Sequence, residues 1–156
     1  MSFVITGIPV SRFQHLVDLT EAQLEAKGIV RQTATCKPGF PCRVTLEDAE
    51  VGEPVLLLNY VSHRVNSPYR SSFAIYVREN ANQTATFVDE LPPVMQGRPI
   101  ALRLFGSDGT LCGADLCLKE GLEQKIVDSL ERPDVAYLHA HNAAHGCFSA
   151  EIRRAA

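Results

Sequence analysis

Runs of apolar residues, alternating in some segments and continuous in others, predict mostly β-strands along this chain. The stretch PVLLLNY at 54–60 is almost continuously apolar, which is typical of a strand buried on both faces. The sequence Ser107-Asp108-Gly109 is a strong hairpin turn signal between two predicted strands. The predicted strands are 3–8, which we expect at a sheet edge, 29–35, 54–60, 72–78, 99–105, 110–118, 133–141 and 147–154.

Helices are predicted in three places. A short helix is expected over Ser11–Leu16, with the serine as its cap. Thr20 and Gln23 form a capping box for a second short helix, which we expect to end before Gly28. Segment 119–130 carries apolar residues at helical spacing and predicts an amphipathic helix.

Strands therefore outnumber helices, and most of the connections between strands have hairpin length. This pattern predicts an α+β fold with a largely antiparallel β-sheet, two short N-terminal helices and one amphipathic helix near the C-terminus. The prolines and glycine of CKPGFPCR at 36–43 predict a stiff loop, and the polar segment 80–97 is expected to be a surface excursion. The length of 156 residues predicts a single domain over 1–156.

Charge and composition narrow the function classes. The net charge of −3 disfavours nucleic-acid binding by bulk electrostatics, although a local cluster of arginines could still hold a small anion. No apolar run approaches the ~18 residues of a membrane span, and no basic region precedes an apolar run at the N-terminus as in a signal peptide. We therefore expect a cytoplasmic protein with no membrane partner and with its five cysteines reduced.

The C-terminal stretch YLHAHNAAHGCFSAEIRR contains three histidines and a cysteine within nine residues. Side chains alternate between the faces of a strand, and paired residues share a face. If the apolar residues of the two strands meet, the imidazoles and the thiol must share the opposite face. We predict the pairing His141–Cys147, which also sets His139 opposite Ser149, Tyr137 opposite Glu151 and Leu138 opposite Ala150; a shift by two residues would pair His139 with Cys147.

Three interpretations of this cluster fit the sequence. In the first, His139, His141 and Cys147 bind a metal ion, and the nitrogen and sulfur donors suit zinc. In the second, Cys147 is a catalytic nucleophile or ligand and His139 a base or ligand, with Asn142 or Glu151 orienting a histidine. In the third, the histidines form the polar side of a hairpin and the cysteine packs as a small hydrophobe.

Residues elsewhere in the chain add further candidates. Guanidinium groups bind carboxylate or phosphate, and they also pair with acidic side chains on the surface. His63 and Tyr69 flank a turn and could line a pocket, while Cys36 and Cys42 are either unrelated thiols or a reversible disulfide. The candidate arginines are Arg43, Arg64, Arg70, Arg78, Arg103 and Arg153.

Three blocks of the chain resemble a family of short bacterial proteins called domain of unknown function 1203. They are PCRVTLEDAEVGEPVLLLNY, SPYRSSFAIYVRE and the C-terminal histidine-rich stretch. The resemblance implies a bacterial cytosolic protein and carries no activity. The family pattern falls on Cys42, Arg43, Ser67, Pro68, Tyr69, Arg70, His139, Asn142, Gly146, Cys147, Phe148 and Arg153.

These observations lead to one main hypothesis and two alternatives. The main hypothesis is a protein that binds a small molecule, an anion or a metal ion at the terminal hairpin. The alternatives are a non-catalytic interaction module, such as a homodimer, and a cysteine–histidine thiol enzyme. The residues that we expect to bind the ligand are Cys42, Arg43, Tyr69, Arg70 and Arg153.

Overall fold

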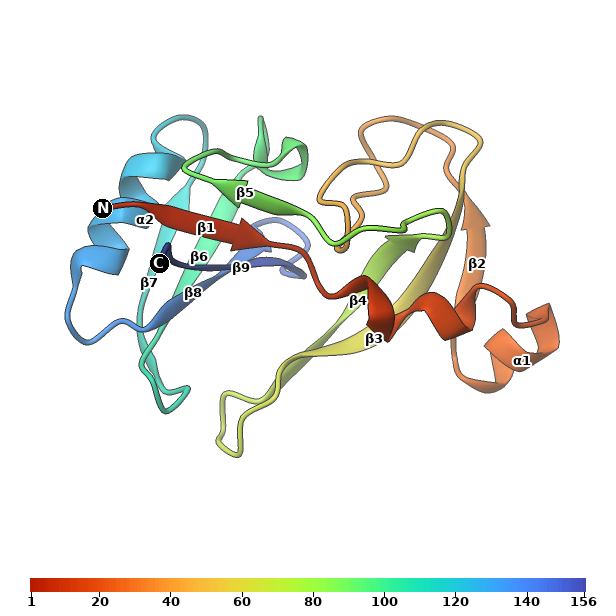
Figure 1. Cartoon of the computed structure of the whole chain (residues 1–156), viewed down its shortest axis with the longest axis horizontal. Coiled ribbons are helices and arrows are strands. Elements are labelled where there is room, and N and C mark those ends of the chain that lie inside the picture. The colour runs from red at the N-terminus through yellow and green to blue at the C-terminus, as the bar shows by residue number, and fades with distance from the viewer.

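In the computed structural model, residues 1–156 fold into two β-sheets that lie side by side (Figure 1). The larger sheet has the strand order β5-β1-β9-β8-β6-β7 and the smaller one has the order β2-β3-β4. Neighbouring strands are antiparallel throughout. The strands are β1 (Phe3–Thr6), β2 (Val30–Thr33), β3 (Pro54–His63), β4 (Ser71–Arg78), β5 (Thr86–Val88), β6 (Ile100–Phe105), β7 (Leu111–Cys117), β8 (Tyr137–Asn142) and β9 (Phe148–Arg154).

Two α-helices complete the predicted α+β fold, which is thereby confirmed. The predicted capping box begins α1 (Glu21–Ala26), where the Thr20 side chain accepts from the backbone N–H of Gln23. The amphipathic helix is α2 (Leu122–Glu131). Neither helix has the length and apolar character needed to span a lipid bilayer.

Three local predictions were wrong. The first N-terminal helix is only two short 3-10 turns, Val10–Arg12 and Gln14–Leu16, without a side-chain cap. Strand β1 is not an edge strand, because β5 pairs with it on one side and β9 on the other. The segment 80–97 is not merely a surface excursion, since it supplies β5 and the buried Val94 and Met95.

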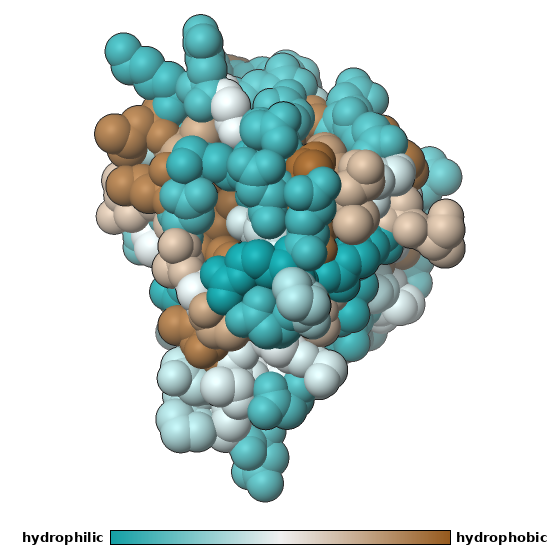
Figure 2. All heavy atoms as spheres, turned by 90° about the vertical axis from the view of Figure 1, so that its left-hand side faces the viewer, coloured by the Kyte–Doolittle hydropathy of each residue, from teal (hydrophilic) through white to brown (hydrophobic).

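One face of the six-stranded sheet is covered by α2. The apolar side chains of the helix pack against those of β6, β8 and β9. Figure 2 shows this end of the molecule, where hydrophilic side chains cover most of the surface. The shared core includes Leu102, Leu104, Leu122, Ile126, Leu130, Leu138, Ala140 and Ile152.

The other face of this sheet meets the three-stranded sheet. A second apolar cluster joins Phe148 of β9 to Leu58 and Ile75 of the small sheet. The chain leaves β1 through Gly7, where a Cβ atom would lie 2.1 Å from the carbonyl oxygen of Val44. Only glycine fits this close approach, which draws the N-terminal segment against the loop before β3.

Candidate functional site

The terminal hairpin has the predicted separation of faces over most of its length but a different register. His139 lies opposite Glu151 and Ala140 lies opposite Ala150, whereas Ser149 had been predicted opposite His139. A bulge then places His141 opposite Phe148 instead of Cys147. The predicted pairings of His139 and His141 with Cys147 were therefore wrong.

The bulge also moves one aromatic side chain to the other face of the sheet. Phe148 had been predicted to share a face with Ala150 and Ile152. The extra residue turns its ring toward the imidazoles instead, with its centroid 5.0 Å from that of His139 and 5.9 Å from that of His141. The ring fills the apolar space between the two sheets, which explains why the bulged register is favoured.

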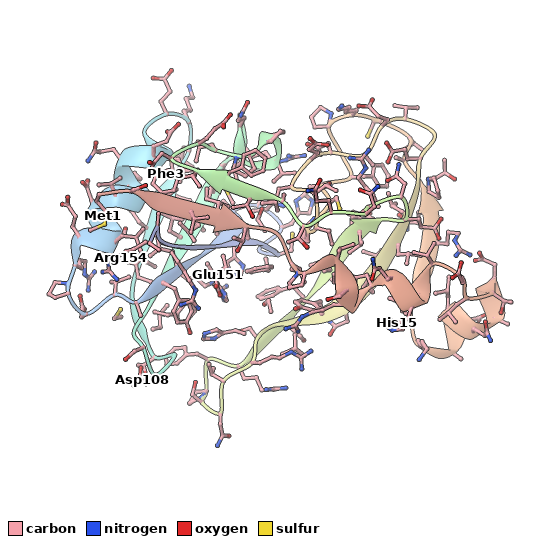
Figure 3. The ribbon with its side chains drawn as sticks, viewed as in Figure 1. Met1, Phe3, His15, Asp108, Glu151 and Arg154 are labelled. Carbon is pink, nitrogen blue, oxygen red and sulfur yellow. The ribbon has the colours of Figure 1, made fainter.

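A hydrogen-bonded group that runs from a buried histidine to an exposed arginine forms where β8 pairs with β9. Nε2 of His139 lies 3.3 Å from Oε2 of Glu151, and Nε of Arg153 donates to Oε1 at 2.5 Å. Burial lowers the pKa of His139, so the ring is neutral at pH 7 and Nε2–H donates to the carboxylate. Burial alone would raise the pKa of Glu151, but the hydrogen bonds from His139 and Arg153 lower it to about 2. Figure 3 shows Glu151 in the middle of the molecule, where β9 faces the small sheet.

A second buried pair links the two sheets. Nδ1 of His63 lies 2.8 Å from the carbonyl oxygen of Tyr69, and Nε2 lies 2.7 Å from Oη of Tyr137. Because a carbonyl can only accept, Nδ1 carries a proton that it donates to Tyr69, and Nε2 accepts from the hydroxyl group of Tyr137. The His63 ring also lies 5.0 Å from the ring of His139. Burial, followed by the charge of Glu151, raises the pKa of Tyr137.

His141 is buried without an acidic partner. Its Nδ1 donates to the carbonyl oxygen of Gly146 at 2.9 Å, and Gly146 has the positive φ of +77° that the hairpin turn requires. Burial lowers the pKa of His141 to about 4. His139 and His141 have their ring centroids 6.5 Å apart, and no three His, Cys, Asp or Glu side chains are grouped closely enough to hold a metal ion. The geometry thus gives the zinc hypothesis no support.

Cys147 has an arginine as its neighbour rather than a histidine. Nη2 of Arg43 lies 3.1 Å from Sγ, and Nδ2 of Asn142 lies 3.6 Å from it. No histidine nitrogen forms a hydrogen bond with this thiol, and the cysteine–histidine pair is absent. Arg43 is itself only 2% exposed and also donates to the carbonyl oxygens of Phe148 and Pro41. Burial lowers the pKa of this guanidinium, and the Cys147 thiol opposes that shift.

A pocket of about 490 Å³ adjoins this group of buried polar residues. It lies between the end of β1, the end of β3 and the start of β9. The guanidinium carbons of Arg12 and Arg64 each lie 5.9 Å from the centroid of the Tyr60 ring. The lining includes Arg12, Tyr60, Ser62, Arg64, Phe148 and Glu151.

The remaining predicted ligand residues lie apart from this pocket. Sγ of Cys42 is fully buried and accepts from the backbone N–H groups of Val44, Thr45 and Arg78. Arg70 is exposed, and Tyr69 contributes its carbonyl oxygen to His63. None of Cys42, Tyr69 and Arg70 lines the pocket, and all five cysteines are free thiols.

Comparison with known proteins agrees with the sequence resemblance. A family model described as "Protein of unknown function (DUF1203)" matches residues 39–154, which is more than half of the chain. The chain belongs to the DUF1203 family. The matched region includes Arg64, His139 and Glu151, whereas Arg12 precedes it. No curated protein and no solved structure matched the chain.

Sequence reasoning had included Arg64 among the candidate arginines but missed Arg12 and Tyr60. Arg12 lies in a segment without a recognisable motif, and Tyr60 ends the block PCRVTLEDAEVGEPVLLLNY without being singled out there. The close passage of Gly7 beside Val44 draws the 3-10 turns toward β3. The spacing of Tyr60 and Arg64, four residues apart at the end of one strand, was the only local indication. Glu151 had been considered as a residue that orients a histidine, and it does contact His139.

Proposed function

We propose that this DUF1203 protein binds a small organic anion in the pocket between β1, β3 and β9. Arg12 and Arg64 would bind the carboxylate or phosphate group, and the rings of Tyr60 and Phe148 would contact the apolar part of the ligand. We also propose the bacterial cytosol as its location, on the strength of the family resemblance alone.

The observation that carries this proposal is the absence of acidic partners for these two arginines. Five other arginines are paired with carboxylates, for example Arg31 with Glu79 and Arg98 with Asp48. Four further arginines also lack an acidic partner but do not line this pocket: Arg43, Arg70, Arg103 and Arg154. Arg12 and Arg64 form no salt bridge or side-chain hydrogen bond, yet both approach the same aromatic ring and line one pocket. Two guanidinium groups without partners beside one cavity form a binding site for an anionic group.

Polar atoms within the pocket support a ligand that carries a hydrogen-bond donor or acceptor as well. Oγ of Ser62 is buried and has no hydrogen-bond partner, which is costly unless a ligand or water supplies one. Glu151 remains ionised and can accept a further hydrogen bond, since each of its oxygens has only one protein donor.

A second pocket of similar volume fits the proposal less well. It is lined by Thr45, Glu47 and residues 82–87, and it contains no arginine. Its only charged residue is acidic, which would repel an anion. The two cavities thus differ in charge rather than in size, and the comparison favours the arginine-lined pocket.

The proposal is tested by isothermal titration calorimetry with the anions benzoate and phenyl phosphate. Benzamide serves as the neutral comparison ligand. Binding of either anion without binding of benzamide would support an anion site, and the tighter of the two anions would distinguish carboxylate from phosphate. We expect Arg64→Gln and Arg12→Gln each to weaken binding about tenfold, because a charge-assisted hydrogen bond is lost.

The matched control is Arg70→Gln. Arg70 is also exposed and also lacks a salt bridge, but it does not line the pocket. Affinity should remain at the wild-type value in this variant. Equal weakening by all three substitutions would indicate that general surface charge attracts the anion, and the pocket would have to be abandoned as the site.

A further inference from the structure

A second chemical site lies where the loop before β3 contacts the turn before β9. Arg43 is almost completely buried and has no acidic partner. A guanidinium has five N–H groups, and protein atoms accept from three of these in Arg43. One N–H group on Nη1 and one on Nη2 are therefore left without a protein acceptor, and Nη2 is the nitrogen that lies beside Sγ of Cys147.

The surroundings of the sulfur are electropositive. Arg43 and Asn142 both donate toward Sγ, and no protein acceptor is paired with a Cys147 S–H. Reactive cysteines are found in such electropositive and partly exposed positions. Cys147 is partly exposed, so a small reagent can reach it.

An unpaired acceptor beside the sulfur is also consistent with an oxidised form of this cysteine. Oδ1 of Asn142 is buried and has no hydrogen-bond partner, although Nδ2 of the same amide contacts Sγ. A hydroxyl group attached to the sulfur would supply the missing donor. If the oxygen were ionised instead, the free N–H groups of Arg43 would bind it.

We propose that Cys147 is a modification site, at which a small hydroperoxide oxidises the thiol to a sulfenic acid. The thiolate attacks one peroxide oxygen, an S–O bond forms, and the O–O bond breaks. Hydroxide leaves when the reagent is hydrogen peroxide, and it takes up a proton from solvent. The sulfur is oxidised by two electrons and the peroxide is reduced by two. The site is separate from the anion pocket, because neither Cys147 nor Arg43 lines that pocket.

The test uses the folded wild-type chain with hydrogen peroxide and dimedone, which traps sulfenic acids, followed by peptide mapping. Cys36 is an internal control, because it is exposed and no side-chain hydrogen bond from a cation reaches its sulfur. We expect Cys147 to be trapped about tenfold faster than Cys36 despite its lower exposure. Trapping of Cys36 at the same rate or faster would overturn the proposal.

Two variants separate the charge from simple accessibility. Asn142→Ala removes one donor from a partly exposed position, and we expect slower trapping of Cys147, while Asn66→Ala on an exposed loop should leave the rate unchanged. Arg43→Lys keeps the positive charge but loses the planar guanidinium group with its several N–H donors. We expect this substitution to lower the ratio of the Cys147 trapping rate to the Cys36 trapping rate. If this buried substitution prevents folding, the trapping rates of Cys147 and Cys36 in the wild type still test the proposal. An unchanged Cys147 rate in a folded Arg43→Lys protein and in Asn142→Ala would contradict the proposal.

Discussion

The two faces of β8 are equally buried but chemically opposite. Leu138 and Ala140 are 0% exposed and pack beneath α2, while His139 and His141 on the other face are 2% exposed and meet the small sheet. An apolar face is stabilised by burial alone. A buried imidazole loses its hydration and needs protein partners, which Glu151 and the carbonyl of Gly146 supply.

This difference indicates what each face contributes. The face under α2 provides the stability of the large sheet. The face between the sheets holds neutral imidazoles, an ionised carboxylate and a tyrosine in fixed positions beside a pocket. Buried polar groups that are held in fixed positions by hydrogen bonds are typical of a site that is preorganised for a ligand.

The largest loss of stability is expected from a substitution on the apolar face of β8. Leu138→Ala should lower the free energy of unfolding by about 2–5 kcal/mol, because it removes fully buried methyl groups and leaves a cavity. Urea denaturation measures the change, and Leu118→Ala, at an exposed leucine, should change it by less than about 0.5 kcal/mol. Similar values for the two variants would contradict the assignment of the core.

Stability on the histidine face should depend on pH. The folded pKa of His141, about 4, lies below its ordinary value of 6.5, so the unfolded chain binds the proton first as pH falls. The contribution of the neutral His141 to the free energy of unfolding is fully present above pH 6.5. It is lost as the pH falls from 6.5 to 4, by up to about 3 kcal/mol. Glu151 acts in a lower window, since its contribution is present above pH 4.5 and is lost toward pH 2.

His141→Asn tests this dependence, because an amide can still donate to the Gly146 carbonyl but does not titrate. Urea denaturation at several pH values should give a shallower decline between pH 6.5 and 4 than in the wild type. The lowered pKa of His139 will maintain part of the slope. A wild-type stability that stays level over this range would contradict the buried, neutral histidines.

A smaller effect is expected where the two sheets are joined by a hydrogen bond. Tyr137→Phe should cost about 1–2 kcal/mol, since it leaves Nε2 of the buried His63 without a donor. The control is Tyr76→Phe, because Oη of Tyr76 is 3.3 Å from Gln32 in a less buried position. Equal costs in the two variants would mean that the link between the sheets adds nothing to stability.

The smallest loss of stability is expected from a substitution at the exposed margin of the polar face. The Arg153 side chain is 52% exposed, donates to Glu151 and lies 4.6 Å above the Tyr137 ring. Arg153→Ala should cost less than about 1 kcal/mol, because exposed ion pairs contribute little. A loss as large as that of Leu138→Ala would show that the two faces do not differ in the way described here.

Local patterns predicted the fold better than the site. Apolar periodicity and turn signals identified most strands, the capping box at Thr20 and the helix α2. The register of the last hairpin could not be predicted, because the bulge places Phe148 in the apolar cluster between the sheets, which forms only in the folded chain. Arg12 and Tyr60 could not be placed together either, since their proximity depends on the close passage of Gly7 beside Val44.

The proposed anion site requires that the polar face between the sheets borders a ligand pocket. This requirement can be tested by titrating the isotopically labelled chain with phenyl phosphate and following the backbone amide chemical shifts. We expect chemical-shift changes concentrated at residues 6–12, 60–64 and 148–151, with α2 unaffected. Changes confined to α2 or spread evenly over the surface, or no changes at millimolar probe, would contradict it.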